Sequence, residues 1–362
     1  MRNTRLEVNI NNFYKNIENI QKYVGNKKIM PVIKANAYGT YINKRIDIIN
    51  NFDIVAVAIV EEAIELRKLG YNKEIFVLNQ PSIEDIDNIL KYEITIGLSD
   101  KIFLENLKSI TKPIKVHLEI ETGMNRTGVN LKDLDRFLDK IKINKNIIVE
   151  GIYTHLSSAD YDRNYTALQL EKFRESVSII KNKIDTIKYI HSSASNGLIN
   201  YKDNISNLVR PGIIMYGYES SNNINEKLDL YPICKLKTQI TFIKAIEAGE
   251  SIGYSRKYIS KNKMKIATIP IGYADGLRRE FSNKGEVVIN NKTAKIVGNI
   301  CMDSCMIDVT NIDNVEIGTN VYIWDNKNIA LESIAEKCNT INYEILSTIS
   351  YRVPREFIFE NK

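Results

Sequence analysis

The sequence is poor in metal-binding residues. Its 362 residues include only four cysteines and three histidines, and neither a CxxC nor an HxxxH pair occurs among them. Structural zinc motifs are built from such pairs, so we predict no metal site. The four cysteines, Cys234, Cys301, Cys305 and Cys338, are expected to be reduced, buried thiols.

Long apolar runs and blocks of like charge are also missing. No stretch approaches the length of a membrane span, and the first residues, MRNTRLEVNI, mix charge with strand-like alternation where a signal peptide would be apolar. The 50 lysines and arginines are scattered among 44 aspartates and glutamates, without a basic stripe interleaved with aromatic residues. We expect a globular, cytoplasmic protein that binds no membrane and no nucleic acid.

The first two thirds of the chain alternate short apolar runs with segments of helical period. Runs rich in isoleucine and valine predict eight strands, at residues 29–33, 54–59, 75–79, 94–98, 114–120, 149–154, 187–191 and 208–216. Helices are predicted between them, for example at 61–69, 131–143 and 167–183. Eight strand–helix units favour an α/β barrel of the (β/α)8 type. A doubly wound open sheet is the alternative, but it normally has fewer strands and a GxGxxG turn that is missing here.

The last third of the chain has a different pattern of apolar and turn-forming residues. Short apolar segments at 236–246, 264–271, 286–289, 295–297, 305–309 and 320–324 are separated by Gly, Asn and Asp, as in an antiparallel β domain. Residues 331–337 predict one helix within this region. We therefore expect a barrel over residues 10–225 and a predominantly β domain over residues 226–362.

Reactive side chains end or follow the predicted strands of the barrel. Lys34 ends the apolar run MPVIK, Glu119 and Arg126 end or follow the fifth strand, His155 follows the sixth, and Ser195 follows the seventh. In a (β/α)8 barrel the C-terminal strand ends meet at one face, which carries the active site. A desolvated lysine at this place suits a Schiff base with pyridoxal phosphate or proton abstraction.

The segment VIKANAYG, at residues 32–39, resembles the motif that carries the cofactor lysine in alanine racemases. The resemblance continues in order along nearly the whole chain, through ETGMNRTGV, GIYTHLSSAD, LVRPGIIMYG, GESIGYSRKY, IPIGYADGLRR, GNICMDSCMIDVT and YEILSTISYRVPR. It implies an isomerase that uses pyridoxal 5'-phosphate to interconvert L- and D-alanine for cell-wall synthesis. It also implies a barrel followed by a β domain, with residues 1–9 joining the β domain.

The resemblance implies two bases. Lys34 would form the Schiff base with the cofactor and act as one base, and Tyr254 would act as the other. Racemisation removes the Cα proton from one face and returns it on the opposite face, so two bases on opposite sides are the direct solution. His155 would hydrogen-bond the tyrosine, with Arg210 behind it. Arg210 would also face the cofactor's pyridine nitrogen, where a permanent cation opposes protonation.

The resemblance also assigns the remaining contacts of the site. The cofactor phosphate would be held by Tyr38, Ser195, Gly212, Ile213 and Tyr351. Arg126 and the backbone of Met302 would bind the carboxylate of the amino-acid substrate, Tyr273 would line the path by which substrate enters, and Asp303 would support these residues. In the family, the residues that match Tyr254 and Met302 come from the neighbouring subunit, so the resemblance implies a homodimer with shared active sites.

Three positions depart from the family pattern. Glu119 stands where many members have a carbamylated lysine, and we expect its carboxylate to pair with Arg126 directly. Thr40 and Tyr41 replace a His-Gly pair, and Ala194 replaces a common asparagine. None of these changes removes a proton-transfer residue.

Other functions remain open at this point. A racemase of broader range would act on serine or a basic amino acid, and a related barrel decarboxylase would need acidic residues for a distal amine. Bulky tyrosines, Tyr254 and Tyr351, are expected near the side-chain pocket and favour alanine. A non-catalytic pyridoxal-phosphate carrier would resemble the first domain only and would need no Tyr254.

Overall fold

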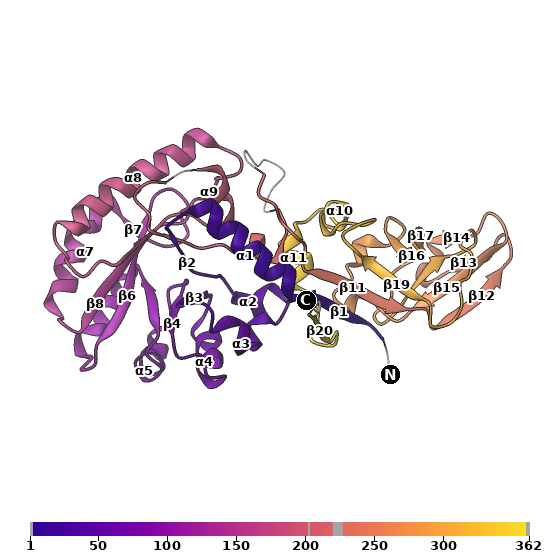
Figure 1. The fold of residues 1–362 in the computed structure, drawn as a ribbon, viewed down its shortest axis with the longest axis horizontal. Coiled ribbons are helices and arrows are strands. Elements are labelled where there is room, and N and C mark those ends of the chain that lie inside the picture. Colours follow the sequence, from indigo (N-terminus) through magenta and orange to yellow (C-terminus); the bar gives the residue numbers. More distant parts are fainter. Residues whose placement is uncertain (1–2, 202, 220–226, 360–362) are drawn as a thin grey trace.

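The computed structural model describes residues 3–201, 203–219 and 227–359. These residues form two lobes side by side along the long axis of the molecule, a barrel and a β domain (Figure 1). The boundary predicted at residues 225 and 226 lies outside the described residues.

The barrel closes from eight short parallel strands. They are β2 (Lys28–Ile29), β3 (Ile54–Val57), β4 (Glu74–Val77), β5 (Thr95–Leu98), β6 (Ile114–Glu121), β8 (Ile147–Tyr153), β9 (Tyr189–His191) and β10 (Leu208–Val209). Strands β3, β4, β5, β6, β8 and β9 pair in this order, and β10 pairs with β2. Bridges between Val32 and Ala56 and between Ala194 and Arg210 join the two sets into a ring. The predicted barrel is confirmed, and the open doubly wound sheet is wrong.

Helices cover the outside of these strands (Figure 1). They are α1 (Ile10–Val24), α3 (Ile46–Ile49), α4 (Val60–Lys68), α5 (Ile86–Lys91), α6 (Lys101–Asn106), α7 (Leu131–Ile143), α8 (Arg163–Lys181) and α9 (Ser195–Asn200). The short strand β7 (Val129–Asn130) pairs with β6. Helix α7 shows why the pattern predicts them: Leu134, Phe137, Leu138 and Ile141 are buried at intervals of three and four residues, which places them on one face.

The β domain contains a nine-stranded sheet in the order β12-β15-β18-β17-β16-β19-β11-β1-β20. Its strands are β1 (Arg5–Asn9), β11 (Cys234–Gln239), β12 (Phe242–Ile246), β15 (Met264–Ile269), β16 (Glu286–Ile289), β17 (Lys292–Val297), β18 (Cys305–Asp308), β19 (Asn320–Trp324) and β20 (Arg355–Ile358). A separate hairpin pairs β13 (Ser251–Ile252) with β14 (Tyr258–Ile259). Two helices, α10 (Leu331–Lys337) and α11 (Asn342–Ser347), complete the domain.

One predicted strand is divided in the structure. Residues 236–246 were expected to form one segment, but β11 ends at Gln239 and β12 begins at Phe242. The Ile240 carbonyl accepts from Gly318, whereas the Thr241 amide donates to Thr268. The two halves therefore bond to different parts of the chain, which alternation of apolar residues along one segment does not reveal.

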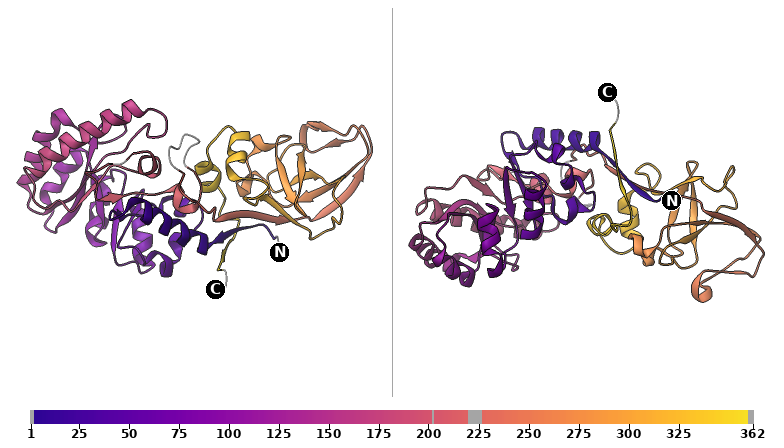
Figure 2. Two further views of the ribbon diagram at one scale, coloured as in Figure 1. Left: turned by 45° about the horizontal axis from the view of Figure 1, so that its top comes forward. Right: turned by 90° about the horizontal axis from the view of Figure 1, so that it is seen from below.

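The first strand belongs to the sheet of the β domain. Strand β1 pairs with β11 in antiparallel and with β20 in parallel orientation, and the chain then enters the barrel lobe through α1. The Asn9 side chain accepts from the Asn12 amide at 2.9 Å and caps this helix. Two further views show the same extended connection between the lobes (Figure 2).

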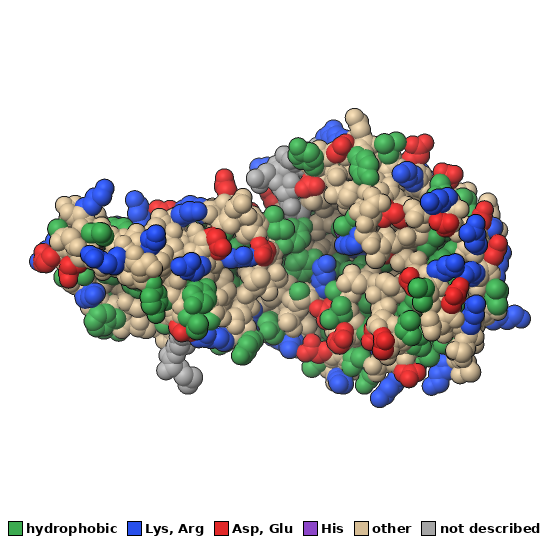
Figure 3. Space-filling view, turned by 180° about the vertical axis from the view of Figure 1, so that it is seen from behind, with side chains coloured by type: hydrophobic (Ala, Val, Ile, Leu, Met, Phe, Trp, Pro, Cys, Tyr) green, Lys and Arg blue, Asp and Glu red, His purple; other side chains and the backbone are tan. Residues whose placement is uncertain are grey.

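The surface carries charges of both signs. On the face seen in Figure 3, Lys and Arg side chains are interspersed with Asp and Glu rather than gathered into one patch. Within the described residues no helix is both long and apolar enough to cross a bilayer. In the same residues, no group of three or more His, Cys, Asp or Glu could hold a metal ion. All four cysteines are free, and Cys301 is the one that is partly exposed.

Candidate active site

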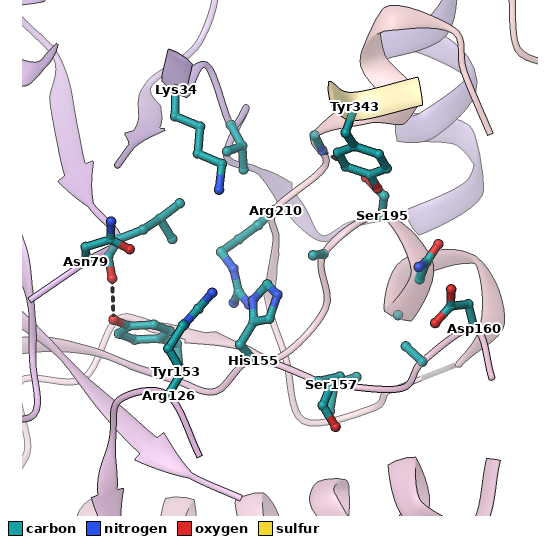
Figure 4. Close-up of a pocket in the computed structure, with 18 of the residues that line it drawn as sticks. Lys34, Asn79, Arg126, Tyr153, His155, Ser157, Asp160, Ser195, Arg210 and Tyr343 are labelled. Atoms are coloured by element: carbon teal, nitrogen blue, oxygen red, sulfur yellow. Dashed lines mark hydrogen bonds between the residues drawn. The ribbon is translucent and has the colours of Figure 1, made fainter. Parts of the chain in front are cut away.

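A cavity of about 230 Å³ opens at the C-terminal ends of the barrel strands. Seven of the residues expected in the site line it, namely Lys34, Tyr38, Arg126, His155, Ser195, Arg210 and Gly212. The Lys34 side chain points into this cavity, with Arg210 and His155 below it in the view of Figure 4. We call it the Lys34 cavity.

Lys34 begins the short turn α2 (Lys34–Tyr38), which has the left-handed sense. Ala35, Asn36, Ala37 and Tyr38 all have φ between 51° and 55°. Each L-residue costs about 1–2 kcal/mol in this conformation, so the surrounding structure must hold the turn. Glu62 contributes to this, because its carboxylate accepts from the Ala35 amide at 2.6 Å and from the Ala58 amide at 2.7 Å.

The environment of Lys34 favours a neutral amine. Burial lowers the pKa of Lys34, and the positive charges of Arg126 and Arg210 lower it further, while Glu62 opposes them. A neutral amine can attack a carbonyl carbon or accept a proton. This is the chemistry expected of a lysine that carries pyridoxal phosphate.

Hydroxyl and amide groups gather at one end of the cavity. The Gly212 amide donates to Ser195 Oγ at 3.1 Å. A Cβ on residue 212 would collide with the Tyr38 hydroxyl, so only glycine lets the two approach. Ile213 is fully buried beside Gly212, but its side chain is not part of the cavity wall. The cluster of donors suits a phosphate.

The structure places Tyr343, rather than Tyr351, in the wall of this cavity. Tyr351 was expected at the phosphate, but it lies in a turn with 84% of its surface exposed. Tyr343 lies on α11, on the same side of the cavity as Ser195 (Figure 4). Its ring lies 5.9 Å from that of Tyr38. Tyr343 is the first residue of the block YEILSTISYRVPR, so the family resemblance already included it. The helix that carries Tyr343 was not predicted from the sequence.

Helix α11 is held against the lysine turn. A Cβ on Gly39 would collide with the Leu346 carbonyl, so the helix packs directly on the backbone that follows Tyr38. Arg355 joins the same elements: its Nε donates to the Gly39 carbonyl at 2.8 Å, and its Nη2 donates to the Ile349 carbonyl at 2.7 Å. Its guanidinium lies over the Tyr41 ring at 4.4 Å. Tyr41 is one of the residues that differ from the family pattern, and this contact gives it a structural role.

Arg210 is 1% exposed and holds the floor of the cavity. Its Nη atoms donate to the carbonyls of His191, Thr154 and Ser192 at 2.8 to 3.1 Å. Nη2 also lies 3.5 Å from His155 Nδ1. Burial lowers the pKa of Arg210 only to about 10, so it stays a cation at neutral pH. Because these bonds use Nη1 and Nη2, the Nε–H is the donor left for a group in the cavity.

His155 is neutral in this environment. Burial lowers its pKa to about 3, and the cations Arg210, Arg126 and Lys34 act in the same direction. Arg210 cannot accept a hydrogen bond, so its contact with His155 Nδ1 favours a lone pair on this atom and the ring proton on Nε2. His155 is thereby prepared to donate a hydrogen bond to an oxygen atom in the cavity.

Glu119 does not form the expected direct ion pair with Arg126. Among the described residues, it hydrogen-bonds instead with Thr127, and Arg126 acts on it only through a longer-range charge interaction. Burial raises the pKa of Glu119. The reason is geometric: Glu119 lies inside β6, where it is 4% exposed, whereas Arg126 follows the strand in a loop.

The remaining expected residues lie in the β domain, outside the Lys34 cavity. Tyr254, Met302 and Asp303 line a second, open hollow of about 700 Å³, which we call the Tyr254 hollow. Tyr254 is 69% exposed and Met302 is 52% exposed. The adjacent strand β13 lies at the end of the β domain that faces away from the barrel (Figure 1).

The loops around this hollow are tied together. The carbonyls of Cys301 and Met302 accept from the amides of Tyr273 and Ala274 at 3.1 and 3.0 Å. Arg352 donates to Asp303 at 2.7 Å and lies 3.6 Å from the buried carboxylate of Asp275. Sequence reasoning missed Arg352, although it lies in the quoted block that ends in YRVPR. These contacts hold the loops that carry Met302 and Asp303 in a defined position.

The Lys34 cavity fits pyridoxal 5'-phosphate in its chemistry. It has an amine of lowered pKa, hydroxyl and amide donors at one end, and a cationic Nε–H donor on its floor. The fold and the site together define a barrel-type pyridoxal-phosphate enzyme.

Comparisons with known proteins identify the family. Residues 8–220 match the family described as alanine racemase, N-terminal domain, and residues 233–357 match alanine racemase, C-terminal domain. The chain therefore belongs to the alanine racemase family, whose members are pyridoxal-phosphate-dependent isomerases.

Individual relatives agree along the full length. A curated alanine racemase of Caldanaerobacter subterraneus is 37% identical to this chain. The alignment covers 100% of this chain and 96% of that protein. The structure of alanine racemase from Clostridium difficile has a TM-score of 0.92 at 33% identity, covering 99% of this chain and 96% of that one. The alanine racemase of Bacillus anthracis with bound L-Ala-P has a TM-score of 0.92 at 32% identity, covering 100% of this chain and 96% of that one.

Proposed function

We propose that the protein racemises alanine with pyridoxal 5'-phosphate in active sites that two copies of the chain share. The observation that carries the proposal is the division of the expected site. One set of residues lines the Lys34 cavity, and the other set lies exposed around the Tyr254 hollow. Neither the Lys34 cavity nor the Tyr254 hollow alone contains both proposed bases, Lys34 and Tyr254.

The proposed reaction needs two proton transfers at the substrate Cα. Lys34 would hold the cofactor until the substrate amino group replaces it, which frees the lysine amine, and the cofactor would then disperse the negative charge left at this carbon. The Lys34 amine, whose pKa is lowered by burial, exchanges the proton on one face. The Tyr254 hydroxyl of the second copy exchanges it on the other face. The same pair runs both directions, because each base begins protonated for one enantiomer and unprotonated for the other.

Neighbouring residues would orient the substrate and the second base. Arg126 would bind the substrate carboxylate, together with the Met302 backbone of the second copy. His155 would donate its Nε2 proton to the Tyr254 oxygen, which favours the deprotonated phenol. Arg210 would present its Nε–H and its charge to the cofactor's ring nitrogen. Tyr38, Ser195, Gly212, Ile213 and Tyr343 would surround the phosphate, with Tyr343 in the place first expected of Tyr351.

The dimer is supported by the exposure of two expected site residues. Tyr254 and Met302 are large apolar side chains that a monomer leaves in water, although their loops are held in place. Burying them against a second barrel would remove this surface from solvent. A head-to-tail arrangement with twofold symmetry would complete both sites at once.

Alanine is the substrate that the cavity and the relatives favour. The relatives named above are alanine racemases, and one of them binds L-Ala-P. The cavity of about 230 Å³ must hold the cofactor and the substrate together, which favours a short side chain. A racemase that prefers serine or a basic amino acid is the second candidate, since one methylene changes discrimination by only about 1–3 kcal/mol.

The direct test is proton NMR of the cofactor-loaded protein in D2O with L-alanine, and with L-serine and L-lysine in parallel. Loss of the Cα–H signal with D-alanine appearing fastest is the expected result. Faster exchange of serine or lysine would name the broader racemase instead. Bound cofactor with no exchange in any sample would contradict racemisation and favour the non-catalytic carrier.

A further inference from the structure

Behind Arg210, a chain of hydrogen bonds runs into the core of the barrel. Arg210 Nη1 lies 2.7 Å from His191 Nδ1, and His191 Nε2 lies 2.8 Å from His117 Nδ1. His191 and His117 are both 0% exposed. His117 is on β6, and His191 is on β9. His117 does not reach the Lys34 cavity, so none of the roles given above uses it.

Only one arrangement of ring protons satisfies this chain. Arg210 can only donate, so His191 Nδ1 must accept. Burial lowers the pKa of both histidines, so each neutral ring carries one proton. The proton of His191 therefore lies on Nε2, which donates to His117 Nδ1. The proton of His117 then lies on its Nε2, an atom with no hydrogen-bond partner among the described residues.

We propose that His117 is a positioning residue, which holds His191 in the tautomer that accepts from Arg210 and so keeps the Arg210 guanidinium aimed at the cofactor. This rests on the proposed function in one respect, namely that Arg210 faces the cofactor's ring nitrogen. The arrangement of protons itself depends only on the geometry.

Aromatic rings pack against both imidazoles. Phe76 stacks on the His117 ring with centroids 4.4 Å apart, and Tyr153 stacks on the His191 ring at 5.2 Å. Without an acceptor at residue 117, the His191 proton would be buried unpaired, or it would move to Nδ1 and confront a donor of Arg210. Either outcome displaces the guanidinium from its place on the cavity floor. Gly151 supports the position of His117, because a Cβ there would collide with the imidazole.

A pair of variants separates this role from simple packing. His117→Asn and His117→Leu remove the same ring and leave side chains of the same branched shape, but only asparagine keeps an acceptor near the position of Nδ1. We expect His117→Leu to lower kcat for alanine about tenfold with KM changed less than about twofold, because Arg210 does not touch the substrate carboxylate. His117→Asn should recover most of kcat, and the absorption spectrum of bound cofactor should shift in the leucine variant alone. Equal losses in both variants would overturn the proposal.

Nitrogen-15 NMR of the holoenzyme tests the proton arrangement without relying on turnover. The chain has only three histidines, and His117→Asn and His155→Gln assign the signals. We expect His191 to have an unprotonated Nδ1 and a protonated Nε2, and to change only in the leucine variant. A protonated Nδ1 on His191 in the unmodified enzyme would overturn the inference while leaving racemisation intact. Absence of racemisation with the expected NMR signals would instead contradict the proposed function.

Discussion

The two lobes present their expected active-site residues in opposite ways. The barrel gathers Lys34, Arg210 and their neighbours in the walls of one cavity, where burial and charge set their protonation. The β domain leaves Tyr254 and Met302 exposed on loops that are nevertheless fixed by hydrogen bonds. One chain thus has a buried cavity that lacks the second base and, at the far end of the other lobe, an exposed tyrosine that lacks a cavity. This is the arrangement expected if two copies share each active site.

The largest effect is expected from removing the exposed base. Tyr254→Phe keeps the ring and loses the hydroxyl, so racemisation should fall about a thousandfold in both directions. Cofactor binding should be unchanged, because Tyr254 lies outside the Lys34 cavity. Kinetics from each enantiomer and a cofactor titration measure these quantities. Tyr161→Phe, at another exposed tyrosine on the barrel lobe, is the matched control. Full activity of Tyr254→Phe would mean that the β domain supplies no base.

The two lobes also differ in their titratable groups, because all three histidines of the chain lie in the barrel lobe. The pKa values of His117 and His155 are lowered to about 3, and that of His191 lies well below its usual value. Unfolded histidines bind protons below about pH 6.5 and these folded ones do not, so stability is lost as pH falls through this range. We expect a loss of about 1 kcal/mol per histidine between pH 7 and 5.5.

Urea unfolding followed by circular dichroism measures this loss. His117→Asn should reduce the pH dependence by about one third, as it removes one of three equivalent protons. A free energy of unfolding that stays constant over the same interval would show that the histidines are not buried as neutral groups.

A smaller effect distinguishes two tyrosines of the β domain. Tyr343→Phe should weaken cofactor affinity about tenfold, because its hydroxyl belongs to the wall of the Lys34 cavity. Tyr351→Phe should leave the affinity unchanged, because Tyr351 lies exposed in a turn. Absorbance titration of the apoenzyme compares the two. The opposite ranking would restore Tyr351 to the phosphate site.

The smallest effect is expected at Glu119. Its carboxylate hydrogen-bonds Thr127 and acts on Arg126 only from a distance, so Glu119→Gln keeps the hydrogen bond and removes one charge. The KM for alanine should rise about threefold with little change in kcat. Steady-state kinetics decide this, with Glu171→Gln, at an exposed carboxylate on α8, as the control. An increase much above tenfold would indicate that Glu119 and Arg126 do form a tight pair.

The sequence predicted the parts of the fold that follow from periodicity. Helix α7 occupies residues 131–143 as expected, and all eight barrel strands lie within or beside their predicted segments. Periodicity could not reveal the left-handed turn after Lys34, because Ala35 to Tyr38 include no glycine to signal it. It also missed α11, whose six residues are too few to show a period, and with it the place of Tyr343. Such features depend on tertiary contacts, here the carboxylate of Glu62 and the backbone of Gly39.

Mixing two inactive variants tests the shared site most directly. Lys34→Ala lacks the base of the Lys34 cavity, and Tyr254→Phe lacks the base of the Tyr254 hollow. If each site combines the two lobes from different chains, dissociating and reassociating an equal mixture should produce hybrid dimers with one intact site each. Racemisation should then rise from near zero to about one quarter of the wild-type rate. A mixture that stays inactive, although labelled chains show that hybrid dimers have formed, would contradict a site built from two copies.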